Sequence, residues 1–73
     1  MPLTFAKQGE KVVIQKIGGK AETKKFLETL GFVVGETITI VNQVAGNLII
    51  NVKESRVAIS KEMAGKITVQ VEG

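Results

Sequence analysis

The sequence contains no cysteine, histidine, tyrosine or tryptophan, and three phenylalanines are its only aromatic residues. Without imidazole and thiolate, the chain lacks the usual general base, the thiol nucleophile and the ligands of most zinc and transition-metal sites. The two serines, Ser55 and Ser60, have no histidine to activate them. The seven acidic residues are spread singly, which favours solvated surface charge over a cation site. We therefore expect no catalysis and no resident metal or other cofactor.

Long apolar stretches are also missing, since no apolar run exceeds three residues. A membrane-spanning helix needs about 20 such residues, and the N-terminal residues lack the apolar segment of a signal peptide. Together with the lack of cysteine, this favours a cytoplasmic protein without direct membrane insertion. Residues 1–73 are expected to form a single domain with a small core.

What the sequence does contain is valine and isoleucine in alternating patterns, which favour β-strands. Glycine occurs eight times and proline once, so glycine is expected to make the turns. The patterns predict strands over 10–17, 36–44, 48–52, 56–60 and 67–71, a helix over 21–30, a helical turn over 61–65, and chain reversals at 45–47 and 54–55. Such an order predicts a mainly β fold, a small five-stranded barrel with one short helix inserted after the first strand.

The alternation also predicts which side chains face the core. In the first strand, Val12 and Ile14 are expected on one face, and Val13 and Ile17 on the other. Val41 and Ile49 are expected to point outward, so apolar residues outnumber those that one small core requires. Side chains expected to point inward are Ile38, Ile40, Leu48, Ile50, Val52, Val57, Ile59, Ile67, Val69 and Val71.

The end of the helix has its own signal. Gly31 is expected to stop the helix, because glycine enters the left-handed region without a Cβ clash and lets the last carbonyls be capped. Phe32 would then pack on Leu27 in a Schellman ending. Phe26 is expected on the same apolar stripe, which leaves Phe5 as the one aromatic side chain free to stack on a base.

The corner between the helix and the next strand, residues 31–35, ends at a second glycine, Gly35. Within it, Val33 and Val34 compete for one inward site. Each valine taken singly is expected to be covered by strands, helix or N-terminal residues. An exposed group of such side chains would instead mark a protein contact.

The net charge of +3 is weak evidence for a nucleic-acid partner. Four lysines, Lys16, Lys20, Lys24 and Lys25, are close in sequence and could share a surface. Because aromatic side chains for base stacking are scarce, a solvated helix face is favoured over a nucleic-acid site.

Three segments of the chain carry a family resemblance: GEKVVIQKIGG (9–19), FLETLGFVVGETITIV (26–41) and VAISKEMAGKITV (57–69). The most specific part is the helix ending, in which Leu30, Gly31 and Phe32 are followed by Gly35 and a strand. With these residues the chain resembles the FeoA-type ferrous iron transport proteins over 3–71.

The resemblance implies an SH3-like barrel and a family-level link to transition metal ions. It also implies a cytosolic, non-enzymatic accessory protein that docks on the cytoplasmic GTP-binding part of the membrane transporter FeoB and modulates it. The residues we expect at the docking surface are Lys24, Lys25, Val33 and Val34, because the valine pair lies beside a basic helix face. Alternatives are a small-barrel nucleic-acid binder, a stand-alone relative of the C-terminal domain of DtxR-type metal-dependent repressors, and weak self-association through outward valines and isoleucines.

Overall fold

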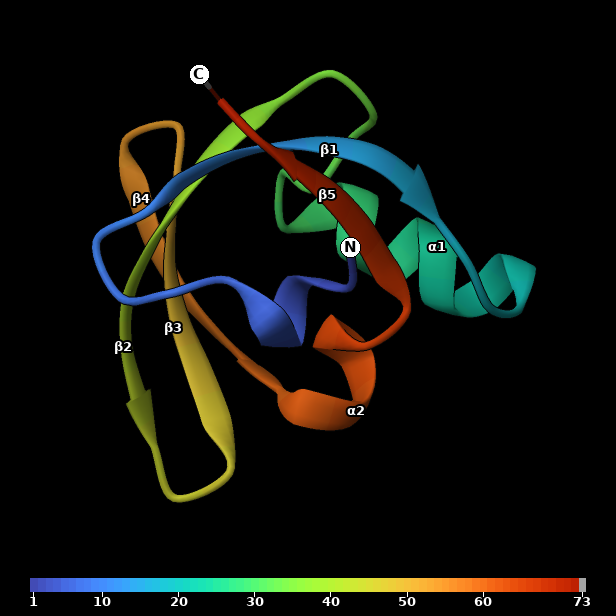
Figure 1. Cartoon of the computed structure of the whole chain (residues 1–73). Coiled ribbons are helices and arrows are strands. Elements are labelled where there is room, and N and C mark those ends of the chain that lie inside the picture. The colour runs from blue at the N-terminus through green and yellow to red at the C-terminus, as the bar shows by residue number, and fades with distance from the viewer. Residues whose placement is uncertain (73) are drawn as a thin grey trace.

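A computed structural model describes residues 1–72 of the chain. Figure 1 shows the elements in order: η1 (Leu3–Phe5), β1 (Lys11–Ile17), α1 (Ala21–Thr29), β2 (Thr37–Val44), β3 (Asn47–Val52), β4 (Ser55–Ser60), α2 (Lys61–Ala64) and β5 (Ile67–Val71). The predicted order of strands and helices is confirmed, and the 3-10 turn η1 is an addition to it. Within residues 1–72, no helix has the length and apolar character that crossing a membrane requires.

The five strands form one antiparallel sheet in the order β4-β3-β2-β1-β5. The sheet curls: in Figure 1, β1 and β5 run across the upper part of the view, whereas β2, β3 and β4 run down its left side. The outer edge of β5 is covered in part by the N-terminal residues, since Pro2 bridges Thr68 and the Val69 N–H donates to the Met1 carbonyl at 2.7 Å. Pairing of this kind protects an edge strand from unwanted partners. The fold is the predicted mainly β small barrel.

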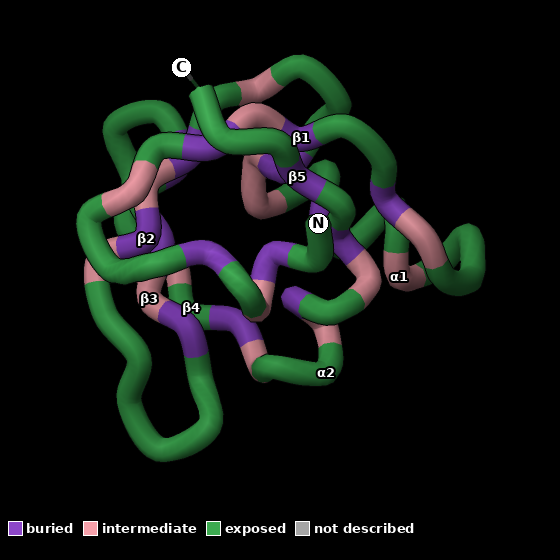
Figure 2. Tube along the Cα trace, viewed as in Figure 1, coloured by how far each residue is buried: buried purple, intermediate pink, exposed green. Residues whose placement is uncertain are grey.

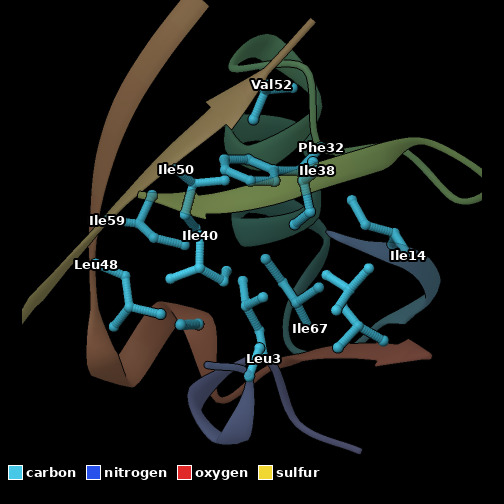
Figure 3. Close-up of a cluster of buried hydrophobic side chains, with 14 of the residues drawn as sticks. Leu3, Ile14, Phe32, Ile38, Ile40, Leu48, Ile50, Val52, Ile59 and Ile67 are labelled. Carbon is cyan, nitrogen blue, oxygen red and sulfur yellow. The ribbon is translucent and has the colours of Figure 1, made fainter. Parts of the chain in front are cut away.

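The core lies between the curled sheet, the two helices and η1 (Figures 2 and 3). Phe32 is its largest fully buried side chain, and Leu3, Leu27 and Ala64 enter it from η1, α1 and α2. The side chains expected to point inward are buried, apart from Val57, which is partly buried, and Val71, which is 46% exposed. Val71 is the last residue of the edge strand β5.

The predicted orientation of one side chain of β1, that of Ile17, is wrong. Ile17 was expected to point outward with Val13, but it is 8% exposed and belongs to the core, whereas Val13 is half-buried. The pairing of β1 with β5 shifts register between Ile14 and Lys16, which marks a bulge at Gln15. The extra residue changes the alternation, so every side chain beyond it turns to the opposite face.

The first hairpin turn uses two of the three residues expected, and the second lies one residue earlier than expected, at 53–54. Val44 pairs with Asn47, so Ala45 and Gly46 make the first turn, and both have positive φ, 48° and 82°. Positive φ at both central residues is what a type I′ hairpin turn requires. In the second hairpin Val52 pairs with Ser55, and Lys53 has a φ of 57°.

Candidate functional site

The end of α1 has the Schellman geometry that the sequence indicates. The Gly31 N–H donates to the Glu28 carbonyl and the Phe32 N–H donates to the Leu27 carbonyl, both at 2.9 Å. Gly31 has a φ of +103°, and a Cβ at this position would lie 2.8 Å from Cγ1 of Val52. The conformation and the close approach both require glycine here. Phe32 is thereby directed into the core with Leu27.

The rest of the corner leaves the core. Val33 is 37% exposed and Val34 is 65% exposed. Gly35, at φ +91°, turns the chain back, and its N–H donates to the Ile14 carbonyl at 2.8 Å. The Ile14 N–H in turn donates to the Glu36 carbonyl at 3.0 Å. These two hydrogen bonds join the two ends of a long connection, which leaves β1, includes α1 and returns at the corner.

A groove of about 410 Å³ lies between β1, α1 and the corner. We call it the corner groove. Three segments line it: the bulged end of β1, one face of α1 and the exposed valines of the corner. Its lining residues are Gln15, Lys16, Ile17, Lys24, Glu28, Val33 and Val34. The groove therefore combines apolar walls with two lysines and one glutamate.

Three of the four residues expected at a docking surface meet in the corner groove: Lys24, Val33 and Val34. Lys25 is exposed on α1 but does not line the groove. The reason is helical geometry: Lys24 and Glu28 are one turn apart on the same face, whereas Lys25 lies about 100° further round.

The expected surface of four lysines is only partly formed. Lys16 and Lys24 line the same groove, one from β1 and one from α1, although eight positions separate them. Lys20 and Lys25 are exposed outside its lining.

The expectation for Phe26 is wrong. Its side chain is 52% exposed, while its neighbour Leu27 is fully buried. The apolar stripe of so short a helix is too narrow for both side chains to reach the core. Phe5 is 71% exposed, so two aromatic side chains, not one, are accessible to a partner.

Some groove residues gave no signal in the sequence. Gln15 and Ile17 reach the groove because of the bulge in β1, and a single bulge leaves no periodic pattern in a strand of this length. Glu28 could have been found, because it follows Lys24 by four residues on a predicted helix.

A second hollow of about 590 Å³ lies over β5 and the N-terminal residue, and it shares Gln15 with the corner groove. Met1, Thr68, Val69, Gln70 and Val71 complete its lining, so no charged side chain contributes to it. The corner groove is thus the one of these two hollows with charged side chains. Among the described residues, no group of three or more acidic side chains is placed to hold a metal ion.

A family model described as the FeoA domain matches residues 1–71. The chain belongs to the FeoA family. This family is one of Fe(2+) transport accessory proteins. The chain is 35% identical over 69 residues to the "Putative Fe(2+) transport protein A" of Methanocaldococcus jannaschii, a match covering 94% of this chain and 84% of that protein.

Solved structures give the same result for the fold. The crystal structure of an iron uptake regulatory protein (FeoA) is 29% identical, with a TM-score of 0.92 over 99% of this chain and 97% of that one. A manganese-dependent transcriptional repressor in complex with manganese has a TM-score of 0.91 at 13% identity, over 99% of this chain and 36% of the repressor. At that identity the likeness shows the fold alone. The SH3-like fold of the FeoA family, and its occurrence within larger metal-dependent repressors, are confirmed.

Proposed function

We propose that this protein is a cytoplasmic, non-enzymatic accessory protein of ferrous iron uptake that docks on the cytoplasmic GTP-binding part of the FeoB transporter and modulates it. Membership of the FeoA family supports the link to ferrous iron transport. The corner groove is the observation that supports docking, because it is a recess with exposed apolar walls beside charged side chains. Docking sites on proteins combine such features.

The contact is centred on Val34, the more exposed of the two corner valines. Burial of one valine side chain against a partner contributes about 1.5 kcal/mol. Two valines contribute about 3 kcal/mol, which is less than association itself costs, so other contacts in the groove must add to them and the complex is expected to be weak and reversible. Such a complex suits an accessory protein that binds and leaves a transporter. Lys24 lies in the same groove, and Lys25 is proposed to contribute less because it lies outside the lining.

Titration against the cytoplasmic domain of FeoB tests the proposal. We compare the wild-type protein with Val34→Glu and with Val44→Glu, because Val44 is another exposed valine, at 51%, on the β2–β3 hairpin. Val34→Glu is expected to weaken binding at least about tenfold, since it replaces an apolar contact by a charge that must be desolvated. Val44→Glu is expected to bind like the wild type. Equal affinities for all three proteins remove the corner from the interface, and no binding by the wild type refutes the partner assignment.

The exposure of Phe26 supports a second candidate function. Phe26 lies on α1 next to Lys25, and an aromatic side chain beside a lysine can stack on an unpaired base while the charge contacts phosphate. A nucleic-acid partner predicts that affinity for single-stranded RNA or DNA falls steeply as salt rises. No binding at low salt, or a flat salt response, rules it out.

A further inference from the structure

The end of β1 borders the corner groove, and within residues 1–72 no strand lies beside it on that side. In the described part of the chain, β2 pairs with β1 over Lys11, Val12 and Val13 alone. The next residue, Ile14, is bonded to the corner by its two backbone hydrogen bonds. Beyond it, Ile17 lines the groove. The sheet therefore stops short here on one side of β1, although β5 continues on the other side.

The hydrogen bonding to β5 shows where the backbone of Ile17 points. The Gly18 N–H donates to the Lys66 carbonyl at 2.7 Å, so Gly18 faces β5. In an antiparallel ladder, successive residues direct their N–H and C=O groups to opposite sides. Because Ile17 pairs with Ile67 in this register, its N–H and C=O face away from β5, toward the groove. The N–H and C=O groups of Ile17 can therefore form backbone hydrogen bonds with one residue of an extended segment.

The side chains around this point select the charge of such a segment. The groove is lined by two lysines, Lys16 and Lys24, and by one acidic residue, Glu28, so it carries a net charge of +1. Val33 and Val34 form its apolar wall. Successive side chains of an extended segment point to opposite sides. A segment that alternates acidic and apolar residues can therefore direct carboxylates to the lysines and apolar groups to the valines.

We infer that the corner groove binds a short, acidic segment of the partner protein in extended conformation, with its backbone paired to Ile17 at the free end of β1. The segment adds a strand residue to the sheet, its carboxylates contact Lys16 and Lys24, and its apolar side chains cover the corner valines. Main-chain pairing supplies affinity and the alternate side chains supply specificity, as in other cases of strand addition. The inference rests on the proposed function, because it specifies how the cytoplasmic domain of the transporter is recognised.

Charge reversal tests the recognition of an acidic segment. The FeoB cytoplasmic domain is titrated with wild-type protein, Lys16→Glu, Lys24→Glu and the matched control Lys11→Glu, which lies on the same strand outside the groove. Lys16→Glu and Lys24→Glu are each expected to weaken binding about three- to tenfold, and the loss is expected to shrink as salt is raised. Lys11→Glu is expected to change the affinity less than about twofold.

Amide hydrogen exchange tests the backbone pairing directly. In the complex, exchange of the Ile17 amide is expected to slow at least about tenfold, because its N–H becomes hydrogen-bonded. Amides at the tip of the β2–β3 hairpin, residues 45–46, are expected to exchange as in the free protein. Protection at Ile17 together with the loss on charge reversal supports the inference.

The outcomes separate this inference from the proposed function. If the wild type binds, but the Ile17 amide is not protected or Lys16→Glu and Lys24→Glu bind as well as Lys11→Glu, the acidic extended segment is refuted and docking on FeoB stands. If the wild type does not bind the domain, both proposals are wrong. A single-stranded RNA probe that protects Ile17 and loses affinity on Lys16→Glu would assign the groove to nucleic acid and overturn the inference.

Discussion

The corner after α1 and the tip of the β2–β3 hairpin are two reversals of the chain that expose a valine, Val34 at 65% and Val44 at 51%. Their surroundings differ. At the corner, Phe32 is buried next to the exposed valines, and a groove with charged side chains adjoins them. The hairpin tip extends away from the core, and residues 42–47 are all exposed (Figure 2).

The two reversals also differ in which residues occupy their positive-φ positions. The corner places glycine at both positive-φ positions, Gly31 and Gly35. The hairpin tip places Ala45 at positive φ, where a side chain is strained. The corner is held by packing of Phe32 in the core as well as by backbone conformation, whereas the tip is held by its turn and by one backbone hydrogen bond, from the Lys61 N–H to the Gly46 carbonyl at 3.1 Å. We therefore interpret the exposed valine at the corner, and not the one at the hairpin tip, as part of a binding surface.

The largest expected effect is on the anchor of the corner. Phe32→Ala is expected to lower the free energy of unfolding by about 3–5 kcal/mol, because it removes a fully buried aromatic side chain and leaves a cavity. Phe5→Ala, at a site that is 71% exposed, is the control, with an expected change within about 0.5 kcal/mol. Chemical denaturation of the two variants measures both. Similar stabilities would show that the corner is not anchored through Phe32.

The next effect separates the two glycines of the corner. Gly31→Ala is expected to cost about 3 kcal/mol, because it combines strain at positive φ with a clash against Val52. Gly35→Ala has the same kind of strain, but none of the residues that the structure describes has an atom within 4 Å of the new Cβ, so about 1 kcal/mol is expected. Equal losses, measured by chemical denaturation, would mean that packing against Val52 does not constrain the helix end.

A smaller effect of opposite sign is expected at the hairpin tip. Ala45→Asn is expected to stabilise the protein by about 0.5–1 kcal/mol, because asparagine tolerates positive φ and Asn-Gly is the favoured pair in a type I′ turn. Ala45→Val is expected to destabilise it, since a β-branched side chain is poorly tolerated there. Thermal unfolding of the two variants checks the sign. A loss of stability with asparagine would contradict the turn geometry.

The smallest effect concerns the two exposed valines. Val34→Glu and Val44→Glu are each expected to change the free energy of unfolding by less than about 0.5 kcal/mol, because neither side chain belongs to the core. Denaturant titration measures this change. A substantial destabilisation by Val34→Glu alone would mean that the corner valine is structural and that a loss of binding by this variant reflects unfolding.

Much of the fold was predictable because its signals are local. Alternation of valine and isoleucine predicted the strands, and the pair Gly31 and Phe32 predicted the Schellman ending. Two expectations for single side chains were wrong, those for Ile17 and Phe26. The first depends on a bulge against β5, and the second depends on which of two adjacent residues of α1 faces the core.

The candidate site was predictable in part. Lys24, Val33 and Val34 were predicted together because the valine pair lies beside a basic helix face, and they meet in one groove. Lys16 was named only within a cluster of lysines, and Gln15 and Ile17 were not associated with the site. They belong to a segment that becomes a neighbour of the corner through the hydrogen bonds of Ile14 to Gly35 and Glu36.

The sequence alone determined the order of the elements, the end of α1 at Gly31 and most of the core, because periodicity and the conformational freedom of glycine act over a few residues. Its segments also indicated the FeoA family. Only the tertiary structure decided that, among the described residues, no second strand lies beside the end of β1, and that Lys16 and Lys24 share one groove with the exposed valines. Strand register and bulges join residues far apart in the chain, and they result from packing of the whole sheet rather than from any local pattern.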